Sequence, residues 1–164
     1  VAQSGTTIAN VFATLGNMVL ALLNNNVGMT APVWVLAPRT VQGLMTALDA
    51  NAQPVFREEL LKGMLWGFPV VVTNHQPVTL NPGANKSEIM LYDGDELTIG
   101  QGPQLQVAMS EEGVMINGSE ITSAFQQNMT LMRVISEVDL VARHAEAIAV
   151  GTGITWAPGV ITAA

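Results

Sequence analysis

Few side chains in this sequence could carry out a reaction. The two histidines, His75 and His144, fall in a Pro-flanked stretch and in an expected turn, and the chain has no cysteine. A histidine without a nearby partner is more often structural than catalytic. No G-x-S-x-G, Walker A, dinucleotide-binding glycine pattern or H-E-x-x-H occurs. We therefore expect no catalytic residue and no cofactor.

One acidic turn is the strongest candidate for a metal site. Asp93, Asp95 and Glu96 could hold a hard cation through oxygen ligands. The ligand spacing of an EF-hand is not met, however, and Asp-Gly-Asp between two strands is typical of an ordinary turn. We expect no metal here. An enzyme or binding module would be favoured only if this turn, His75 and His144 clustered in one concave site.

Composition limits the class of protein. The chain has 164 residues, 49% of them hydrophobic and only 12% charged, with a net charge of −7. This favours one folded domain with a proper core over disorder. It also argues against a nucleic-acid binder, which would show a basic face. The low charge indicates that part of the surface contacts something other than water.

The stretch from Leu60 to Asn74 is the element around which the chain can be placed. Trp66, Gly67 and Phe68 lead through a tight corner into the run Pro69–Thr73. Proline is tolerated as the first residue of a strand. Because the run is uninterrupted and β-branched, it predicts a central strand buried on both faces.

Two helices are predicted upstream of this corner. Apolar residues recur at helical spacing from Ile8 to Leu23, with Ser4 or Thr6 as the cap. This segment is uncharged, as are all of the first 38 residues, but it is shorter than a membrane span and interrupted by polar residues. We expect no membrane partner. A short strand at 32–36 leads into a second helix, from about Pro38 to Leu48.

From Glu88 onward the hydrophobic period changes to two. Strands are predicted at 89–92, 97–99, 105–109 and 114–116, forming an antiparallel meander. Alternation over 125–143 predicts a further extended strand, followed by a short one at 147–150. The fold class is therefore α+β, with two helices on a mixed or antiparallel sheet.

The order of these pieces resembles the major capsid proteins of tailed bacteriophages, which have the Hong Kong 97 fold. The corner at 61–71 is similar to the family's L-x-G-x-P-V signature, and 91–95 to its hydrophobic-x-G-D turn. The segment from Phe125 through Asn128 and Arg133 resembles its terminal block. The motif residues on which the resemblance rests are Trp66, Gly67, Pro69, Asp95, Phe125, Arg133 and Ala147.

The resemblance implies a division of the chain. Residues 1–124 would be an axial-type domain, residues 125–151 would be strands of the peripheral domain, and residues 152–164 a tail. The family's N-terminal arm, extended loop and spine helix would lie upstream, which agrees with a chain that starts at Val1 without an initiator Met.

Some members of that family lock their shells with an isopeptide bond between a lysine and an asparagine, assisted by a glutamate. Asn128 stands where the asparagine would be, but Ile135 occupies the position of the assisting carboxylate. Without a general base the reaction lacks a proton acceptor. We therefore expect Asn128 to be structural.

The function implied by the resemblance is that of a self-assembling shell subunit of a phage or prophage. Its partners would be copies of itself in pentamers and hexamers, together with scaffolding, portal and maturation protease proteins. The shell would enclose DNA without sequence-specific binding, in a virion assembled in the cytoplasm of a bacterial host. Two alternatives remain: an encapsulin-like compartment holding cargo protein, and an unrelated small α+β enzyme or binding module.

Overall fold

The computed structural model describes residues 5–80, 86–102 and 105–163. They form two compact units. The first comprises Val1–Leu97 and Ala142–Ala164, and the second comprises Thr98–Val141. The sequence-based boundary at 124/125 lies inside the second unit, and the division into axial-type and peripheral domains stays a prediction. Two short 3₁₀ turns, η1 (Gly94–Glu96) and η2 (Ala145–Ala147), lie in the first unit.

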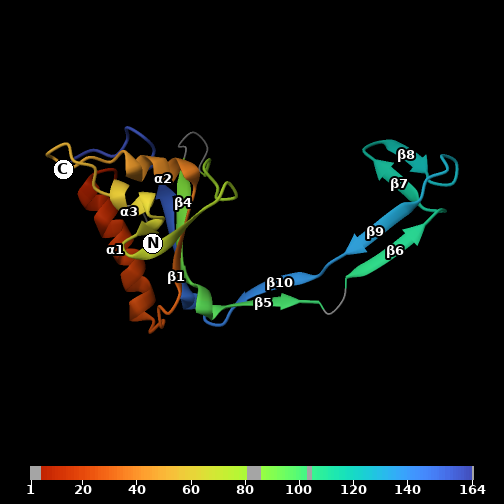
Figure 1. The fold of residues 1–164 in the computed structure, drawn as a ribbon, viewed down its shortest axis with the longest axis horizontal. Helices are drawn as coiled ribbons and strands as arrows, with labels where there is room; N and C mark the ends of the chain where they lie inside the picture. Colours follow the sequence, from red (N-terminus) through yellow and green to blue (C-terminus); the bar gives the residue numbers. More distant parts are fainter. Residues whose placement is uncertain (1–4, 81–85, 103–104, 164) are drawn as a thin grey trace. The chain divides into compact units, whose positions relative to one another are not determined.

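A five-stranded mixed sheet forms the centre of the first unit (Figure 1). Its order is β11 (Ile148–Ile154), β4 (Ser87–Asp93), β1 (Pro32–Leu36), β3 (Phe68–Val72) and β2 (Met64–Leu65). Strands β1 and β3 are parallel, and the other pairs are antiparallel. The fold is therefore of the α+β class, as predicted.

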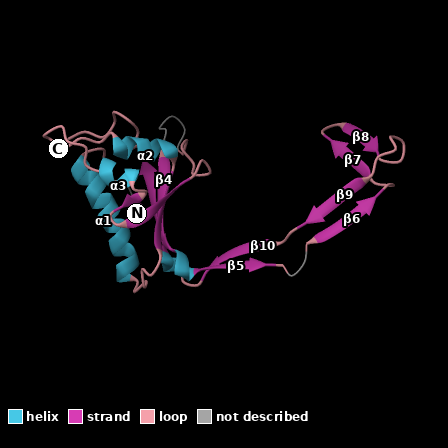
Figure 2. Cartoon of the chain, in the orientation of Figure 1, coloured by secondary structure: helices cyan, strands magenta, loops and turns pink. Residues whose placement is uncertain are grey.

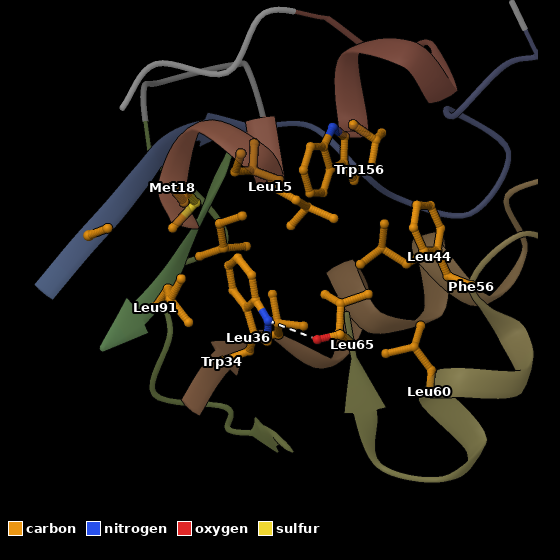
Figure 3. Packing of buried hydrophobic residues seen from close by; sticks show 14 of the residues in the cluster. Leu15, Met18, Trp34, Leu36, Leu44, Phe56, Leu60, Leu65, Leu91 and Trp156 are labelled. Carbon is orange, nitrogen blue, oxygen red and sulfur yellow. Dashed lines mark hydrogen bonds between the residues drawn. The ribbon is translucent and has the colours of Figure 1, made fainter. Parts of the chain in front are cut away.

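All three helices contribute to one hydrophobic core on one face of this sheet. The helices are α1 (Ile8–Asn24), α2 (Pro38–Met45) and α3 (Arg57–Leu61). Trp34, from the middle of the sheet, is fully buried, and its indole N–H donates to the carbonyl oxygen of Leu65 at 3.0 Å. Figure 3 shows Trp34 and Trp156 among aliphatic side chains from both the helices and the sheet. Burying the indole with its N–H bonded avoids the cost of an unpaired donor.

The first predicted helix is present, with a different cap and a narrower buried face. Thr7 is the N-cap, and its side chain accepts a hydrogen bond from the Asn10 N–H. The predicted alternatives were Thr6, one residue too early, and Ser4, which lies outside the described residues. Phe12 and Leu23, expected on the buried side, are exposed. No helix in the described part of the chain has the length and apolarity to cross a membrane.

The predicted strand at Pro69–Thr73 is present within the sheet, but the prediction that it is buried on both faces is wrong. Strand β3 lies between β1, the middle strand, and the short edge strand β2. Val71 and Val72 are 48% and 50% exposed. An apolar run is compatible with burial on both faces, but it does not show what covers the second face. In this unit the helices cover only one face of the sheet.

The corner before β3 is a tight turn, as expected. Trp66 and Gly67 have φ angles of +55° and +78°, and they join Leu65 and Phe68, which pair across β2 and β3. Two consecutive residues with positive φ are typical of the type I′ hairpin turn. The Glu59 carboxylate accepts a hydrogen bond from the Trp66 N–H at 2.8 Å, which helps to hold this strained residue.

Within the described residues, the second unit contains only strands and loops (Figure 2). The strands are β5 (Leu97–Gln101), β6 (Gln106–Ser110), β7 (Val114–Asn117), β8 (Glu120–Ser123), β9 (Leu131–Ile135) and β10 (Val138–Ala142). They pair as nested hairpins: β5 with β10, β6 with β9, and β7 with β8. Neighbours in sequence therefore pair only at β7–β8, and the expected meander is absent. Alternation identifies a strand but not its partner.

The segment predicted as a tail belongs to the core of the first unit. Strand β11 extends to Ile154 and pairs with β4, where Ala149 lies opposite Leu91. Trp156 is fully buried, and Thr162 forms a bridge with Thr7 at the start of α1. A single tryptophan among small residues has no periodicity, which explains why the pattern gave no sign of burial.

Candidate assembly surface

The second unit exposes an unusual amount of apolar surface. Most of the large hydrophobic residues that are exposed in the described chain belong to it. They are Ile99, Leu105, Val107, Met109, Val114, Met115, Ile116, Ile121, Phe125, Met132, Val134, Val138, Leu140 and Val141. Among its described residues only Ala124 is a buried hydrophobic one. Large exposed apolar patches mark interaction sites.

The register of β6 and β9 sorts these side chains onto one face. Val107 lies opposite Val134, and Met109 opposite Met132. These four residues, 51% to 70% exposed, form what we call the apolar ribbon face. The alternate positions place Ala108 opposite Arg133, so the other face is more polar. Directly opposed residues share a face because side chains alternate along a strand.

A two-stranded ribbon of this kind is unstable in water without further packing. Two paired strands alone are only marginally stable, and further strands or packing of their apolar face against another surface is needed for stability. Next to the apolar ribbon face, a hollow of 520 Å³ opens between the two hairpins, lined by Leu131, Val114 and Met115 among others. Its lining suits an apolar side chain from another surface. The geometry therefore supports the docking of another apolar surface on the apolar ribbon face.

The motif residues from the sequence do not converge on one site. Trp66, Gly67, Pro69, Asp95 and Ala147 belong to the first unit, and Phe125, Asn128 and Arg133 to the second. Only Ala147 of these is fully buried. Trp66 packs on α1, where the centre of its ring lies 5.8 Å from the centre of the Phe12 ring.

Asn128 and Phe125 line a common hollow of 320 Å³. Asn128 has a φ of +50°, a conformation that asparagine tolerates better than most residues, and Phe125 is 77% exposed. Glu111 also lines this hollow. The sequence gave no reason to connect Glu111 with Asn128, because β6 and β9 had not been recognised as partners.

Asp93 has a structural role that the sequence analysis missed. Its carboxylate is buried and accepts hydrogen bonds from the N–H groups of Ala31 at 2.8 Å, Thr30 at 3.0 Å and Asp95 at 3.3 Å. Burial alone would raise the pKa of Asp93. The backbone donors of Ala31, Thr30 and Asp95 outweigh it and hold the pKa below its usual value. The signal was available, since Asp93 shares the buried parity of Ile89 and Leu91.

The two histidines lie in separate settings. The Glu96 carboxylate accepts a hydrogen bond from His144 Nδ1 at 2.8 Å, and Arg143 Nε lies 4.0 Å from the same oxygen. His75 donates its backbone N–H to the Thr73 hydroxyl in the loop after β3. Across residues 5–80, 86–102 and 105–163, no three His, Asp or Glu side chains are grouped so as to hold a metal. The Asp93 carboxylate joins the loop before β1 to the end of β4 through its hydrogen bonds with the Thr30 and Ala31 N–H groups.

Comparison with known proteins decides the family. Residues 1–153 match the phage capsid family. The chain belongs to the phage capsid family. It is also 30% identical over 156 residues to the major capsid protein of Klebsiella oxytoca phage phiKO2. That alignment covers 94% of this chain but 36% of the relative, so the chain spans little more than a third of the relative's length.

Solved structures confirm the capsid-type fold. A structure from Gordonia phage Cozz has a TM-score of 0.61 at 14% identity, covering 93% of this chain and 48% of that one. One from Mycobacterium phage Ogopogo has a TM-score of 0.59 at 16% identity, covering 85% and 48%. The capsid of an empty GTA particle has a TM-score of 0.57 at 18% identity, covering 93% and 47%. The phage capsid fold expected from the motifs is therefore present.

Proposed function

We propose that this chain belongs to the major capsid protein of a tailed phage or prophage, and that it works as a structural subunit of an icosahedral shell. The observation that carries the proposal, beside the family, is the apolar ribbon face. A side chain such as Met109 is 70% exposed in the isolated chain, and a shell of many copies would cover it. On this proposal the chain has no catalytic role.

We propose that the two compact units take the two family roles. The first unit, with its helices on a mixed sheet, corresponds to the axial-type domain that clusters at five-fold and six-fold positions. The ribbon of the second unit corresponds to the peripheral domain. The division at 97/98 and 141/142 supports this assignment better than one at 124/125. Asn128 is then a structural residue at a turn.

The partners follow from this role. Copies of the subunit would form the pentamers and hexamers of the shell, and scaffolding, portal and maturation protease proteins would act in its assembly. The net charge of −7 suits a shell that encloses DNA without binding it tightly. Assembly in the bacterial cytoplasm and residence in the virion complete the proposal.

Electron microscopy of the gene product expressed in full tests this function. Closed particles with icosahedral outlines are expected. Nuclease-protected DNA inside them would support the phage role, whereas a co-purifying enzyme would indicate an encapsulin-like compartment. A protein that stays monomeric even with its neighbouring genes would contradict the shell function.

A further inference from the structure

The outer side of α1 carries no charge. Ala9, Ala13, Asn17, Leu20 and Leu23 are exposed along it, and we call these five residues the uncharged helix face. Leu20 and Leu23 are 50% and 53% exposed. A helix that faces only water normally presents charged side chains there. Its small residues would let another surface approach closely.

The sheet of the same unit has a second surface, on which two neighbouring rows of side chains carry no charge. Across it, Val71, Val35, Met90 and Val150 form one row from β3 to β11. Val33, Tyr92 and Ile148 form the next row. We call these seven residues the open sheet face; none of them is fully buried. Among the described strand residues on this side of the sheet, Glu88 is the charged one.

These two surfaces lie on opposite sides of the first unit. The helices pack on the sheet face that carries Trp34, Leu91 and Ala149. Side chains alternate along a strand, so the open rows point the other way. In Figure 1, α1 lies to one side of β1 and β4. The first unit therefore has two surfaces with little charge on opposite sides, the uncharged helix face and the open sheet face.

We propose that the uncharged helix face of one copy docks on the open sheet face of the next copy. The occupant is a second copy because charge favours it. All charged residues lie after residue 38, and with a net charge of −7 like copies repel, except where both surfaces lack charge. A contact between two different surfaces of the same subunit is heterologous, and it closes into a ring when the rotation allows. The proposal rests on the shell function and names the contact within a capsomer.

Cysteine cross-linking of the assembled full-length protein tests the contact, because the described chain has no cysteine of its own. The double variant Leu20→Cys with Val71→Cys is treated with a short bis-maleimide. A covalent ladder of subunits, up to the size of the ring, is expected. Leu20→Cys alone and Val71→Cys alone should give no ladder, while a mixture of the two single variants should give heterodimers.

Matched controls separate this contact from general crowding. Leu20→Cys combined with Val160→Cys, another exposed apolar position in the first unit, should give no ladder. Intact particles with no cross-link in the Leu20–Val71 variant, or dimers from Leu20→Cys alone, would overturn the docking and leave the shell function standing. A protein that never assembles would overturn both.

Discussion

At the scale of single residues, Asp93 is a buried polar side chain whose loss should destabilise the first unit. In Asp93→Asn the amide group replaces Oδ2, which accepts from the Thr30 N–H at 3.0 Å. The side-chain N–H of the asparagine then faces the backbone N–H of Thr30, and this buried donor loses its acceptor. We expect the free energy of unfolding to fall by about 2–3 kcal/mol. Urea denaturation followed by circular dichroism measures it. Asp95→Asn, at an exposed carboxylate in the same turn, should change it by less than about 0.5 kcal/mol.

The same carboxylate makes stability depend on pH. The pKa of Asp93 is lower in the folded state than in the unfolded chain, where it is near 3.8. The unfolded state therefore binds the proton more readily. The contribution of Asp93 is fully present above that value and is lost as the pH falls through the folded pKa. Denaturation at pH 3 and pH 6 should show a smaller loss on acidification for Asp93→Asn than for the native protein. Equal losses would mean that another carboxylate is responsible.

At the scale of elements, two glycines in helices should respond oppositely to the same substitution. A Cβ at Gly16, within α1, would lie 3.5 Å from Trp66 Cη2, which is an ordinary contact. Gly16→Ala should therefore stabilise the protein by about 0.5–1 kcal/mol through helix propensity. A Cβ at Gly43, within α2, would lie 2.8 Å from the Trp156 carbonyl oxygen. Gly43→Ala should destabilise it by about 1–3 kcal/mol. Thermal unfolding of both variants checks the two signs.

The apolar ribbon face should matter for assembly more than for folding. In Met109→Glu a carboxylate enters the cross-strand pair with Met132. Its burial against another subunit would be unfavourable, so we expect the yield of particles to fall about tenfold or more. Ala108→Glu is the matched control, since it places a carboxylate opposite Arg133 on the other face. Sedimentation of both variants measures assembly. Equal yields would show that the face is not an interface.

The sequence predicted the elements better than their partners. Helical spacing located α1, and the Trp66-Gly67 pair located the hairpin turn, because both signals are local. The pairing of β6 with β9 joins residues about 25 apart, and no local signal encodes it. Asp93 was identified as an acidic residue in a turn, but its backbone donors at Thr30 and Ala31 come from more than 60 residues away. Trp156 was missed because a single tryptophan among small residues shows no periodicity.

At the scale of the whole molecule, a small charged fraction and a negative net charge have to be reconciled. Only 12% of the residues are charged, yet acidic residues outnumber basic ones by 13 to 6. On the proposed shell function, the acidic excess of this chain would oppose contact between copies, whereas the uncharged helix face, the open sheet face and the apolar ribbon face would offer contacts where repulsion is weak. Assembly then depends on hydrophobic burial acting against a general electrostatic repulsion.

This balance predicts how salt acts on assembly. Raising the ionic strength from about 10 mM to about 0.5 M shortens the Debye length from about 30 Å to a few ångströms, which screens repulsion between subunits. Hydrophobic contacts are not weakened by this change. We expect the rate and extent of particle formation, followed by light scattering, to rise with salt. A variant with Glu58, Glu111 and Glu112 changed to Gln, which makes the net charge of −7 less negative, should assemble at low salt and respond less to added salt. Assembly that weakens with salt would instead mean that ion pairs carry the subunit contacts, and the uncharged faces would then have another role.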